Sequence, residues 1–538
     1  MTAIALLLEA FGSLWRGDSL WAGGERFGRD PYADLGGLLR MRPLEVRQAG
    51  LGWAWYYDRG LPPGARGLWY GGLRLEDPFT REPLPILAPQ DAGALRWHPA
   101  LGFSWADRPE PPEPLTVLGY HQALRGGLEA FGAAHAQRLY GSTWLSLQYG
   151  LGSDRGRWPG EEVRNRTVGA GISTRRGPWR WTLRYAADAH NGRSNEGWAV
   201  SNPPAWSLWE RTPPWIAPQG RTWRLRREWA RLQALHPKWG EWGLVRQFYR
   251  YAFETRSRRF AAWSLQGRFR QTGGDFEWEL GRAEATDSAW PQALRLSWLE
   301  VRILDTIRPP LWAGMRLRWG SKGGEALAGA WGARLGRGDV WMLGGWMGPD
   351  WEERGARGRQ AGIAFLHLSG VWSDARWRWE PFVTLSRTDT TSVLVAGAEL
   401  ILQWRRGLWG GTGRLLGQLQ RGAPRALPEL SVRLEGYRDF FVAQGAWRFR
   451  LEAVLSGQSG GCRSAWDLTR LRRWPASGPG TPPGLWLDLR LFAQSGRAWP
   501  YLALDNALDG LPGVVLPTAY RPLDRRRVRW GLLWELSY

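Results

Sequence analysis

Arginines at regular spacings are the residues of this chain with the clearest capacity for chemistry. Three pairs stand two or four positions apart: Arg180 and Arg184, Arg316 and Arg318, and Arg448 and Arg450. These spacings place both side chains of a pair on one face of a β-strand. Because guanidinium groups bind carboxylate and phosphate oxygens through paired hydrogen bonds, we predict that these arginines contact a small solute, with an anionic one favoured. The simpler alternative is that they only hydrate a polar surface and pair with carboxylates.

Residues that commonly perform catalysis or bind metals are few and scattered. The six histidines are His98, His121, His135, His190, His236 and His367. His121 and His135 fall on neighbouring expected strands and could meet, although histidines without a catalytic role are much more common. There is no P-loop, no Gly-x-Ser-x-Gly turn and no His-Glu-x-x-His motif, and Cys462 has no spaced partners for zinc. The sequence predicts no catalytic, cofactor-binding or metal-binding residues, and a protein that is not an enzyme.

The arginine pairs lie in segments where apolar and polar side chains alternate. In residues 179–185, two tryptophans, a leucine and a tyrosine share one face, and Arg180, Thr182 and Arg184 share the other. The same alternation recurs in residues 311–319, 376–385, 447–455 and 485–491. A period of two is that of a β-strand with one apolar face, so the arginines should all lie on the polar faces of strands.

The last eleven residues alternate most regularly. Trp530, Trp534 and the terminal Tyr538 lie on one apolar face of residues 528–538. A chain that ends on such a strand resembles the closing strand of a bacterial outer-membrane β-barrel. The resemblance implies that these aromatic residues form a C-terminal signal for the barrel-assembly machinery.

The remaining alternation can be placed as about 22 strands between residues 115 and 538, within a range of 16 to 22. The segments include residues 115–123, 127–137, 142–150, 164–175, 177–188, 241–252, 258–271, 310–319, 392–404, 427–438, 441–455, 485–494 and 526–538. Three longer connections, residues 189–220, 456–484 and 505–525, are rich in Pro, Gly or Arg, as expected for extracellular loops. The predicted fold class is an all-β membrane protein, a large antiparallel transmembrane β-barrel.

Composition agrees with a barrel. The chain has 41 Trp and 71 Gly among 538 residues, and Trp concentrates where a membrane meets water. No run reaches the roughly 20 apolar residues of a membrane-spanning helix. A soluble Trp-rich β-protein is disfavoured because no repeat of fixed period is present. The net charge of +22 is spread along the chain rather than clustered, which argues against nucleic acid as a partner.

Residues 31–97 lack this alternation and resemble the plug of TonB-dependent receptors. Residues 34–50 look like the plug's short helix and following strand, 58–60 and 67–80 like its Arg-Gly strand and hairpin, and 85–97 like its final strand. Near the other end, residues 502–509 look like the family's penultimate strand. The resemblance implies a plug inside a barrel of about 22 strands, an energy transducer of the TonB type, and uptake of scarce nutrients.

Two departures from the family pattern stand near the N-terminus. No segment before residue 30 resembles a TonB box, and residues 98–114 form a proline-rich linker where the family has its plug ending. Residues 3–8 are apolar but follow no basic residue, so they only partly match a secretory signal. The expected domains are residues 1–17, a signal-like segment; 18–110, a plug-like domain; and 111–538, the transmembrane β-barrel.

The function predicted from the sequence is transport of a small solute across the bacterial outer membrane by a TonB-dependent receptor-like barrel with its plug inside. The expected partners are outer-membrane lipid, the barrel-assembly machinery, a TonB-type energy transducer and the solute, with no cofactor. Two alternatives stay open: a passive porin or structural barrel without TonB energisation, and a small unrelated N-terminal domain in place of the plug.

Overall fold

The computed structural model of this chain describes part of its sequence. The described residues are 45–47, 54–56, 67–70, 73–74, 92–98, 102–107, 111, 113–124, 127–155, 162–194, 221–253, 256–271, 274–288, 293–305, 312–320, 323–335, 338–347, 363–374, 376–387, 392–422, 428–460, 464–467, 472–475, 483–508 and 526–537. Within these ranges, no helix has the length and apolar character needed to cross a membrane.

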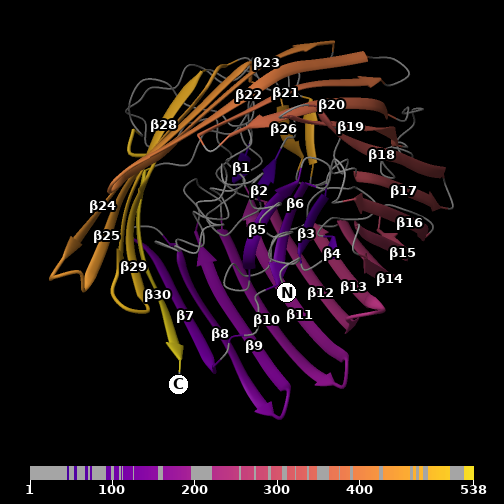
Figure 1. Cartoon of the computed structure of the whole chain (residues 1–538), viewed down its shortest axis with the longest axis horizontal. Coiled ribbons are helices and arrows are strands. Elements are labelled where there is room, and N and C mark those ends of the chain that lie inside the picture. Colours follow the sequence, from indigo (N-terminus) through magenta and orange to yellow (C-terminus); the bar gives the residue numbers. More distant parts are fainter. Residues whose placement is uncertain are drawn as a thin grey trace.

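Among the described residues, 22 antiparallel strands pair in order and close into a barrel (Figure 1). The first half comprises β7 (Leu115–Leu124), β8 (Glu129–Tyr140), β9 (Thr143–Asp154), β10 (Glu162–Arg176), β11 (Trp179–Ser194), β12 (Arg221–His236), β13 (Gly240–Phe253), β14 (Arg256–Gln271), β15 (Gly274–Asp287), β16 (Leu294–Asp305) and β17 (Trp312–Gly320). The second half comprises β18 (Gly323–Leu335), β19 (Gly338–Met347), β20 (Ile363–Ser373), β21 (Trp377–Arg387), β22 (Ser392–Arg406), β23 (Trp409–Arg421), β24 (Leu430–Val442), β25 (Trp447–Gln458), β28 (Gly484–Gln494), β29 (Ala498–Asp505) and β30 (Arg527–Ser537). The last strand pairs with the first, β30 with β7, so the predicted large antiparallel barrel is confirmed.

The two ends of the barrel differ in their connections. At one end, which we call the short-turn end, neighbouring strands are joined by a few residues, as at 141–142, 177–178 and 407–408. At the other, the loop end, residues 195–220 and 506–526 connect strands. The strands are also unequal: β10 to β15 contain 14 to 16 residues, and β28 to β30 contain 8 to 11.

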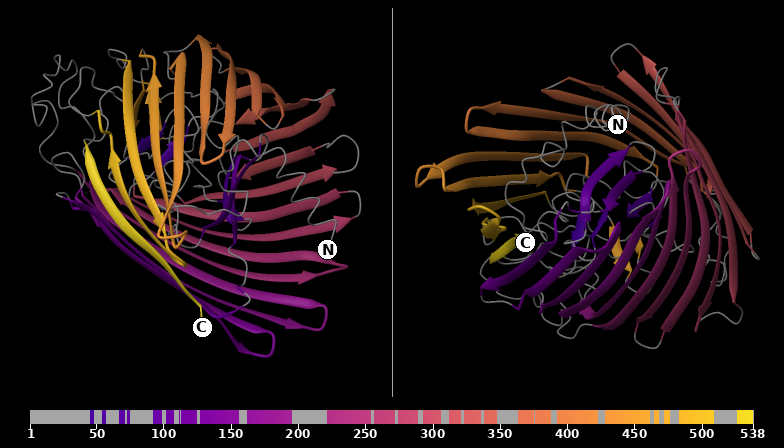
Figure 2. Two further views of the ribbon diagram at one scale, coloured as in Figure 1. Left: turned by 60° about the vertical axis from the view of Figure 1, so that its left-hand side comes forward. Right: turned by 60° about the horizontal axis from the view of Figure 1, so that its bottom comes forward.

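Several short strands do not pair with the barrel strands and form smaller sheets of their own. The first group comprises β1 (Glu45–Arg47), β2 (Ala54–Tyr56), β3 (Gly67–Tyr70), β4 (Leu73–Arg74), β5 (Ala92–His98) and β6 (Gly102–Asp107), and the second comprises β26 (Ser464–Asp467) and β27 (Arg472–Pro475). β1 pairs with β2, and a four-stranded sheet has the order β4-β3-β6-β5. Figures 1 and 2 show β1 to β6 within the ring of barrel strands.

The prediction of a linker over residues 98–114 was wrong in part. β6 occupies Gly102–Asp107 and pairs with β3 in parallel and with β5 antiparallel. Phe103 and Trp105 alternate there with small residues, so the strand pattern was present in the sequence. Apart from Pro99, which precedes the strand, the prolines that suggested a linker begin at Pro109, after the strand has ended.

Two strand boundaries also differ from prediction. The expected strand over 441–455 spans a turn, because β24 ends at Val442 and β25 begins at Trp447. Ala443 and Gln444 have φ of 52° and 55°, a conformation that nothing in their residue types announces. The expected loop over 189–220 begins later, because β11 continues to Ser194. Gly192 stands in that strand, where a Cβ would lie 2.6 Å from the ring of Trp223.

Towards the short-turn end, the outer face of the barrel is apolar, as the alternation predicted. Leucines stand directly opposite one another across neighbouring strands, and all but Leu299, which is half-buried, are exposed. This leucine row is Leu183, Leu232, Leu244, Leu265, Leu280 and Leu299. Two residues nearer the short-turn end, Trp181, Trp242 and Trp278 also face outwards. Side chains of this size exposed over so wide an area require an apolar surrounding.

Towards the loop end of β12 to β16, the polarity of the two faces reverses. Most of the inward side chains there are buried and apolar, and they include Leu225, Tyr249, Phe260, Ala285 and Leu294. The outward side chains on the same stretches are charged and mostly exposed, and include Arg226, Arg250, Arg259, Glu284 and Arg295. The sequence-based prediction assumed that the apolar face stays outside along each strand. The reversal indicates that these strands leave the apolar surrounding before they end.

Candidate functional site in the barrel lumen

Arg448 and Arg450, predicted as solute contacts, lie on the inward face of β25 and share one carboxylate. Arg450 donates to Asp439 of β24 through Nε at 2.7 Å and Nη2 at 2.9 Å, and Arg448 donates to the same group at 2.8 Å. The Arg450 guanidinium also lies 4.0 Å from the centre of the Tyr437 ring. Asp439 is 4% exposed, so this cluster holds β24 and β25 together from the inside.

The same pairing recurs around much of the inward face. Inward arginines bind carboxylates on their own or nearby strands. The pairs are Arg378–Glu380, Arg414–Glu399, Arg433–Glu435, Arg490–Glu452, Arg529–Asp505, Arg258–Asp287 and Arg231–Glu241. Polar groups in a space that water only partly reaches need such partners. The inward charges of these strands therefore neutralise one another.

Arg316 and Arg318 lie on the inward face of β17, and each is 5% exposed. Arg316 stands directly opposite Glu300 of β16. On β16 the indole of Trp298 donates to Glu279 of β15 at 3.1 Å. Both arginines thus lie on a part of the inner wall where neighbouring strands carry the carboxylates of Glu279 and Glu300.

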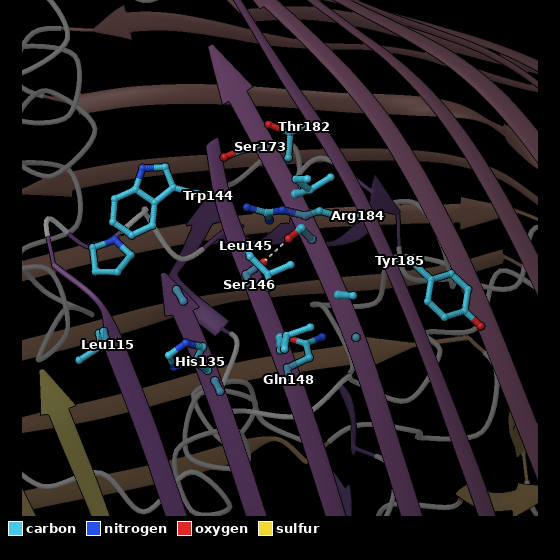
Figure 3. Close-up of a pocket in the computed structure, with 18 of the residues that line it drawn as sticks. Leu115, His135, Trp144, Leu145, Ser146, Gln148, Ser173, Thr182, Arg184 and Tyr185 are labelled. Carbon is cyan, nitrogen blue, oxygen red and sulfur yellow. Dashed lines mark hydrogen bonds between the residues drawn. The ribbon is translucent and has the colours of Figure 1, made fainter. Parts of the chain in front are cut away.

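Arg180 and Arg184 lie on the inward face of β11, and Arg184 lines a cavity of about 110 Å³ in the barrel wall (Figure 3). The cavity is bounded by β7 to β12, with Trp144 and Trp229 among its larger side chains. Hydroxyl and amide groups come from Ser146, Gln148, Ser173 and Thr182. Arg180 is exposed and does not line the cavity. Hydrogen-bond donors together with one guanidinium suit a polar or anionic group.

Two glycines of β10 make this cavity possible. A Cβ on Gly171 would lie 2.5 Å from the Ser146 hydroxyl and 3.3 Å from Cγ of Arg184. A Cβ on Gly169 would lie 2.7 Å from Cδ of Gln148. The Ser146 hydroxyl instead donates to the carbonyl of Gly171 at 3.3 Å (Figure 3). Side chains of β9 and β11 therefore lie over the bare backbone of β10.

Sequence analysis missed a buried polar cluster nearer the loop end. Arg227 of β12 is 1% exposed, and none of its three guanidinium nitrogens has a hydrogen-bond partner among the described residues. On β11, the imidazole of His190 lies 3.1 Å from Oδ2 of Asp188. Arg227 shares one face of β12 with Leu225 and Trp229, at the period of two that is typical of a strand, so the pattern was present in the sequence. Nothing in the sequence singled out Arg227, because its polar neighbours Arg226 and Glu228 face outwards in this stretch.

His121 and His135 are not brought together. His121 faces inwards, 2.9 Å from the hydroxyl of Tyr501, whereas His135 faces outwards, 2.8 Å from that of Thr116. His121 and His135 lie on opposite faces of the wall, so the expectation that they could meet was wrong. Across the described part of the chain, no group of three or more His, Cys, Asp or Glu could hold a metal ion.

The C-terminal strand carries the expected outward aromatic residues. Trp530 and Trp534 of β30 are 37% and 46% exposed on the outer face. Tyr538, the third residue of the predicted assembly signal, lies outside the described residues. The predicted signal-like segment, residues 1–17, also lies outside them, and of the helix and strand expected over residues 34–50 only β1 is described.

Comparison of the chain with known proteins gives no match to a family model and none to a curated sequence. Solved structures do match. A variant of the ferric enterobactin receptor PfeA from Pseudomonas aeruginosa is 12% identical with a TM-score of 0.68, and covers 95% of this chain and 96% of that one. The siderophore receptor PirA from Acinetobacter baumannii is 9% identical with a TM-score of 0.67 and covers 96% of both chains. The FrpB iron transporter from Neisseria meningitidis is 10% identical with a TM-score of 0.67 and covers 93% of this chain and 97% of that one.

At these identities, the similarity establishes the fold. The TonB-dependent receptor-like barrel predicted from the sequence is confirmed, and it extends over nearly the whole length of each of these receptors.

Proposed function

We propose that this chain takes up a small, anionic solute across the bacterial outer membrane. Three observations support the proposal: the closed barrel, the apolar outer surface around the leucine row, and a fold shared with receptors for iron chelates. The loop end faces the outside of the cell, and the short-turn end faces the periplasm, as the short and long connections favour. C-terminal aromatic residues, including Trp530 and Trp534, mark the chain for the barrel-assembly machinery.

The domain division proposed is a signal-like segment (1–17), a plug (18–110) and the barrel (111–538). The position of β1 to β6 within the ring of barrel strands supports it (Figure 2). A plug in the lumen blocks free diffusion, which favours gated uptake driven by an energy transducer. The test is binding of a TonB C-terminal domain to the full chain and to a chain without residues 1–30. Equal or absent binding by both would contradict energised uptake through this segment.

The observation that carries the solute proposal is the cavity at Arg184, where a guanidinium and several donors line the wall. Arg227, buried without a hydrogen-bond partner among the described residues, provides a second cationic contact. Arg180, Arg316 and Arg318 stay candidates for contacts along the wall. Arg448 and Arg450 stay candidates as well, although their hydrogen bonds to Asp439 compete with that role.

A binding experiment tests this assignment. Ferric enterobactin, which the PfeA structures concern, and ferric citrate are titrated into the detergent-solubilised full chain, with tryptophan fluorescence as the readout. Loss of one charge-assisted hydrogen bond should weaken binding about tenfold or more in Arg184→Gln. The matched control is Arg387→Gln, an arginine on the outer face. An Arg184→Gln variant that binds as tightly as the original chain would reject the assignment.

Membrane location has its own test. The folded barrel should migrate differently on a gel before and after boiling, and Trp534→Asp should reduce membrane assembly, because an acidic residue facing hydrocarbon costs up to about 2 kcal/mol. Trp534→Phe is the control. Normal assembly of Trp534→Asp would contradict a lipid-facing position for this side chain of β30.

The alternative is a passive porin or a structural barrel without energisation. Planar-bilayer recordings of the full chain separate it from gated uptake. Steady open conductance would favour the porin, and a reversal potential that shows preference for cations would contradict an anionic solute.

A further inference from the structure

The outer face of the barrel carries a cluster of arginines that solute uptake does not use. On β12 to β15, which are labelled in Figure 1, six exposed arginines lie on the outward face towards the loop end. We call five of them, Arg226, Arg246, Arg250, Arg259 and Arg282, the arginine patch. Their strands leave the apolar band here, as the reversed polarity of their faces indicates.

The register of the strands sets three of these charges side by side. Arg226 of β12 is directly opposite Arg250 of β13, which is directly opposite Arg259 of β14. Like charges in this arrangement repel and destabilise the sheet. Arg226 is relieved by Glu228, 2.6 Å away, whereas Arg250 and Arg259 form no hydrogen bond or ion pair within the described ranges. An anion bound between these two would remove the repulsion.

The other two arginines lie nearer the apolar band and identify where the patch stands. Arg246 and Arg282 are the direct neighbours of Trp263 on either side, and the Arg246 guanidinium lies 5.0 Å from the centre of the Trp263 ring. Two residues further towards the short-turn end, the leucine row begins with Leu244 and Leu280. Trp at such a boundary is typical of the headgroup level of a membrane.

Among the side chains that the structure describes, outward arginines near the loop end cluster on one part of the circumference. On β21 and β23, the outward arginines Arg387 and Arg421 stand singly at the ends of their strands, next to Leu385 and Leu419. The patch is therefore more than a consequence of the basic composition of the chain. It is a concentrated positive surface at the level where phosphate groups of membrane lipids lie.

We propose that the arginine patch binds the phosphate groups of an anionic lipid in the outer leaflet, with the acyl chains of that lipid against the leucine row. Guanidinium groups hold phosphate by paired, charge-assisted hydrogen bonds. Arg250 and Arg259 bind the phosphate, and Arg246 and Arg282 attract it from beside Trp263. The inference rests on the membrane location proposed above and is independent of the transported solute.

Native mass spectrometry of the full chain in neutral detergent tests the proposal, with diphosphoryl lipid A as the probe. Monophosphoryl lipid A, phosphatidylcholine and inorganic pyrophosphate are the comparison ligands. The test variant is Arg250→Gln with Arg259→Gln, and the matched control is Arg387→Gln with Arg421→Gln, which removes two outward arginines elsewhere. Both variants are first shown to fold by their shift on unboiled gels.

The expected result is tight binding of diphosphoryl lipid A, weaker binding of the monophosphoryl form, and none of phosphatidylcholine. The test variant should bind roughly 30-fold more weakly, given the usual contribution of basic residues near an anionic membrane surface, and the control should bind as the original chain does. Equal lipid binding by the test variant and the control would overturn the proposal. Pyrophosphate that binds as tightly as the lipid would also overturn it, in favour of a site for a free anion.

The outcome is separable from the proposed function. Binding of ferric chelates is measured on the same samples, and the test variant should retain it in full. If lipid binding fails while chelate binding persists, only the lipid site is rejected. If chelate binding fails in the original chain while lipid binding persists, only the solute proposal is rejected.

Discussion

Nδ1 of His121 and the hydroxyl of Tyr501 lie 2.9 Å apart, across the backbone of Gly531. This hydrogen bond joins β7 to β29 over the closing strand β30. Both side chains are buried in the lumen. Nearby, Arg527 of β30 forms two 2.8 Å hydrogen bonds with Asp154 of β9. The place where the two ends of the barrel sequence meet is thus held together from the inside by side chains that reach past one strand (His121 to Tyr501) or two (Arg527 to Asp154).

Gly531→Ala should weaken this closure. The added Cβ would lie 2.5 Å from Nδ1 of His121, closer still to the Tyr501 ring, and 2.8 Å from a backbone oxygen. Overpacking of this kind costs about 1–3 kcal/mol. The measurement is the free energy of unfolding in urea, read from gel migration without boiling. Gly436→Ala is the control, because nothing lies within 4 Å of its Cβ position. Equal stability of the two variants would refute the role proposed for Gly531.

Asp439→Asn should destabilise the barrel strongly. It leaves Arg448 and Arg450 without their shared carboxylate in a buried place, and breaking a buried ion pair from one side costs roughly 3–5 kcal/mol. Glu162→Gln is the control, since its partner Arg164 is 73% exposed and an exposed pair contributes at most about 1 kcal/mol. Urea unfolding of both variants checks the prediction. A small effect for Asp439→Asn would leave Arg448 and Arg450 available to a solute.

Arg227→Met should have opposite effects on stability and on binding. The guanidinium is buried without a hydrogen bond among the described residues, and Asp188 keeps its contact with His190. Replacing the charge with an apolar side chain should therefore stabilise the solute-free protein by about 1 kcal/mol or more, while weakening the binding of an anionic chelate. Arg231→Met, on the same face of β12, should instead destabilise the protein, because Arg231 binds Glu241 at 3.0 Å. Two losses of stability would contradict the proposal for Arg227.

Asp374, in the turn between β20 and β21, should make stability depend on pH. The backbone N–H of Arg376 donates to its carboxylate at 2.6 Å and that of Trp377 at 3.0 Å, and the first of these lowers the pKa below its usual 3.8. A lowered pKa stabilises the folded state above about pH 4, and the stabilisation is lost as pH falls through the lowered value. Melting temperatures of the original chain and of Asp374→Ala should therefore differ at pH 7, and the difference should shrink as the pH falls below about 4. A constant difference would contradict this assignment.

The half of the barrel towards the short-turn end was predictable because lipid selects one face of every strand. The Trp179–Tyr185 and Trp530–Trp534 alternations therefore appear directly in the sequence, and they correctly placed Arg180 and Arg184 on the inward face. Beyond the apolar band the inward face becomes the apolar one. The rule that polar side chains face inwards therefore did not fit the sequence around Arg227. A single period cannot reveal a change of surroundings part-way along a strand.

Side-chain partners were not predictable for a different reason. Arg450 and Asp439 are 11 residues apart, and Arg527 and Asp154 are 373 apart. Their meeting depends on the register and on the closure of the whole barrel, which no local pattern fixes. The sequence could therefore place the arginines on the right face without distinguishing those that hold carboxylates from those that line a cavity.

The unequal strand lengths give the barrel a direction within the plane of the membrane. On the side of β10 to β15 the strands are long and carry outward charges near the loop end, whereas on the side of β28 to β30 the strands are short and their outward side chains are apolar up to the loop end. An adjacent membrane protein would therefore contact different surfaces on these two sides. Lateral association should depend on which side is approached, and the side of β28 to β30 offers an apolar surface to a protein neighbour.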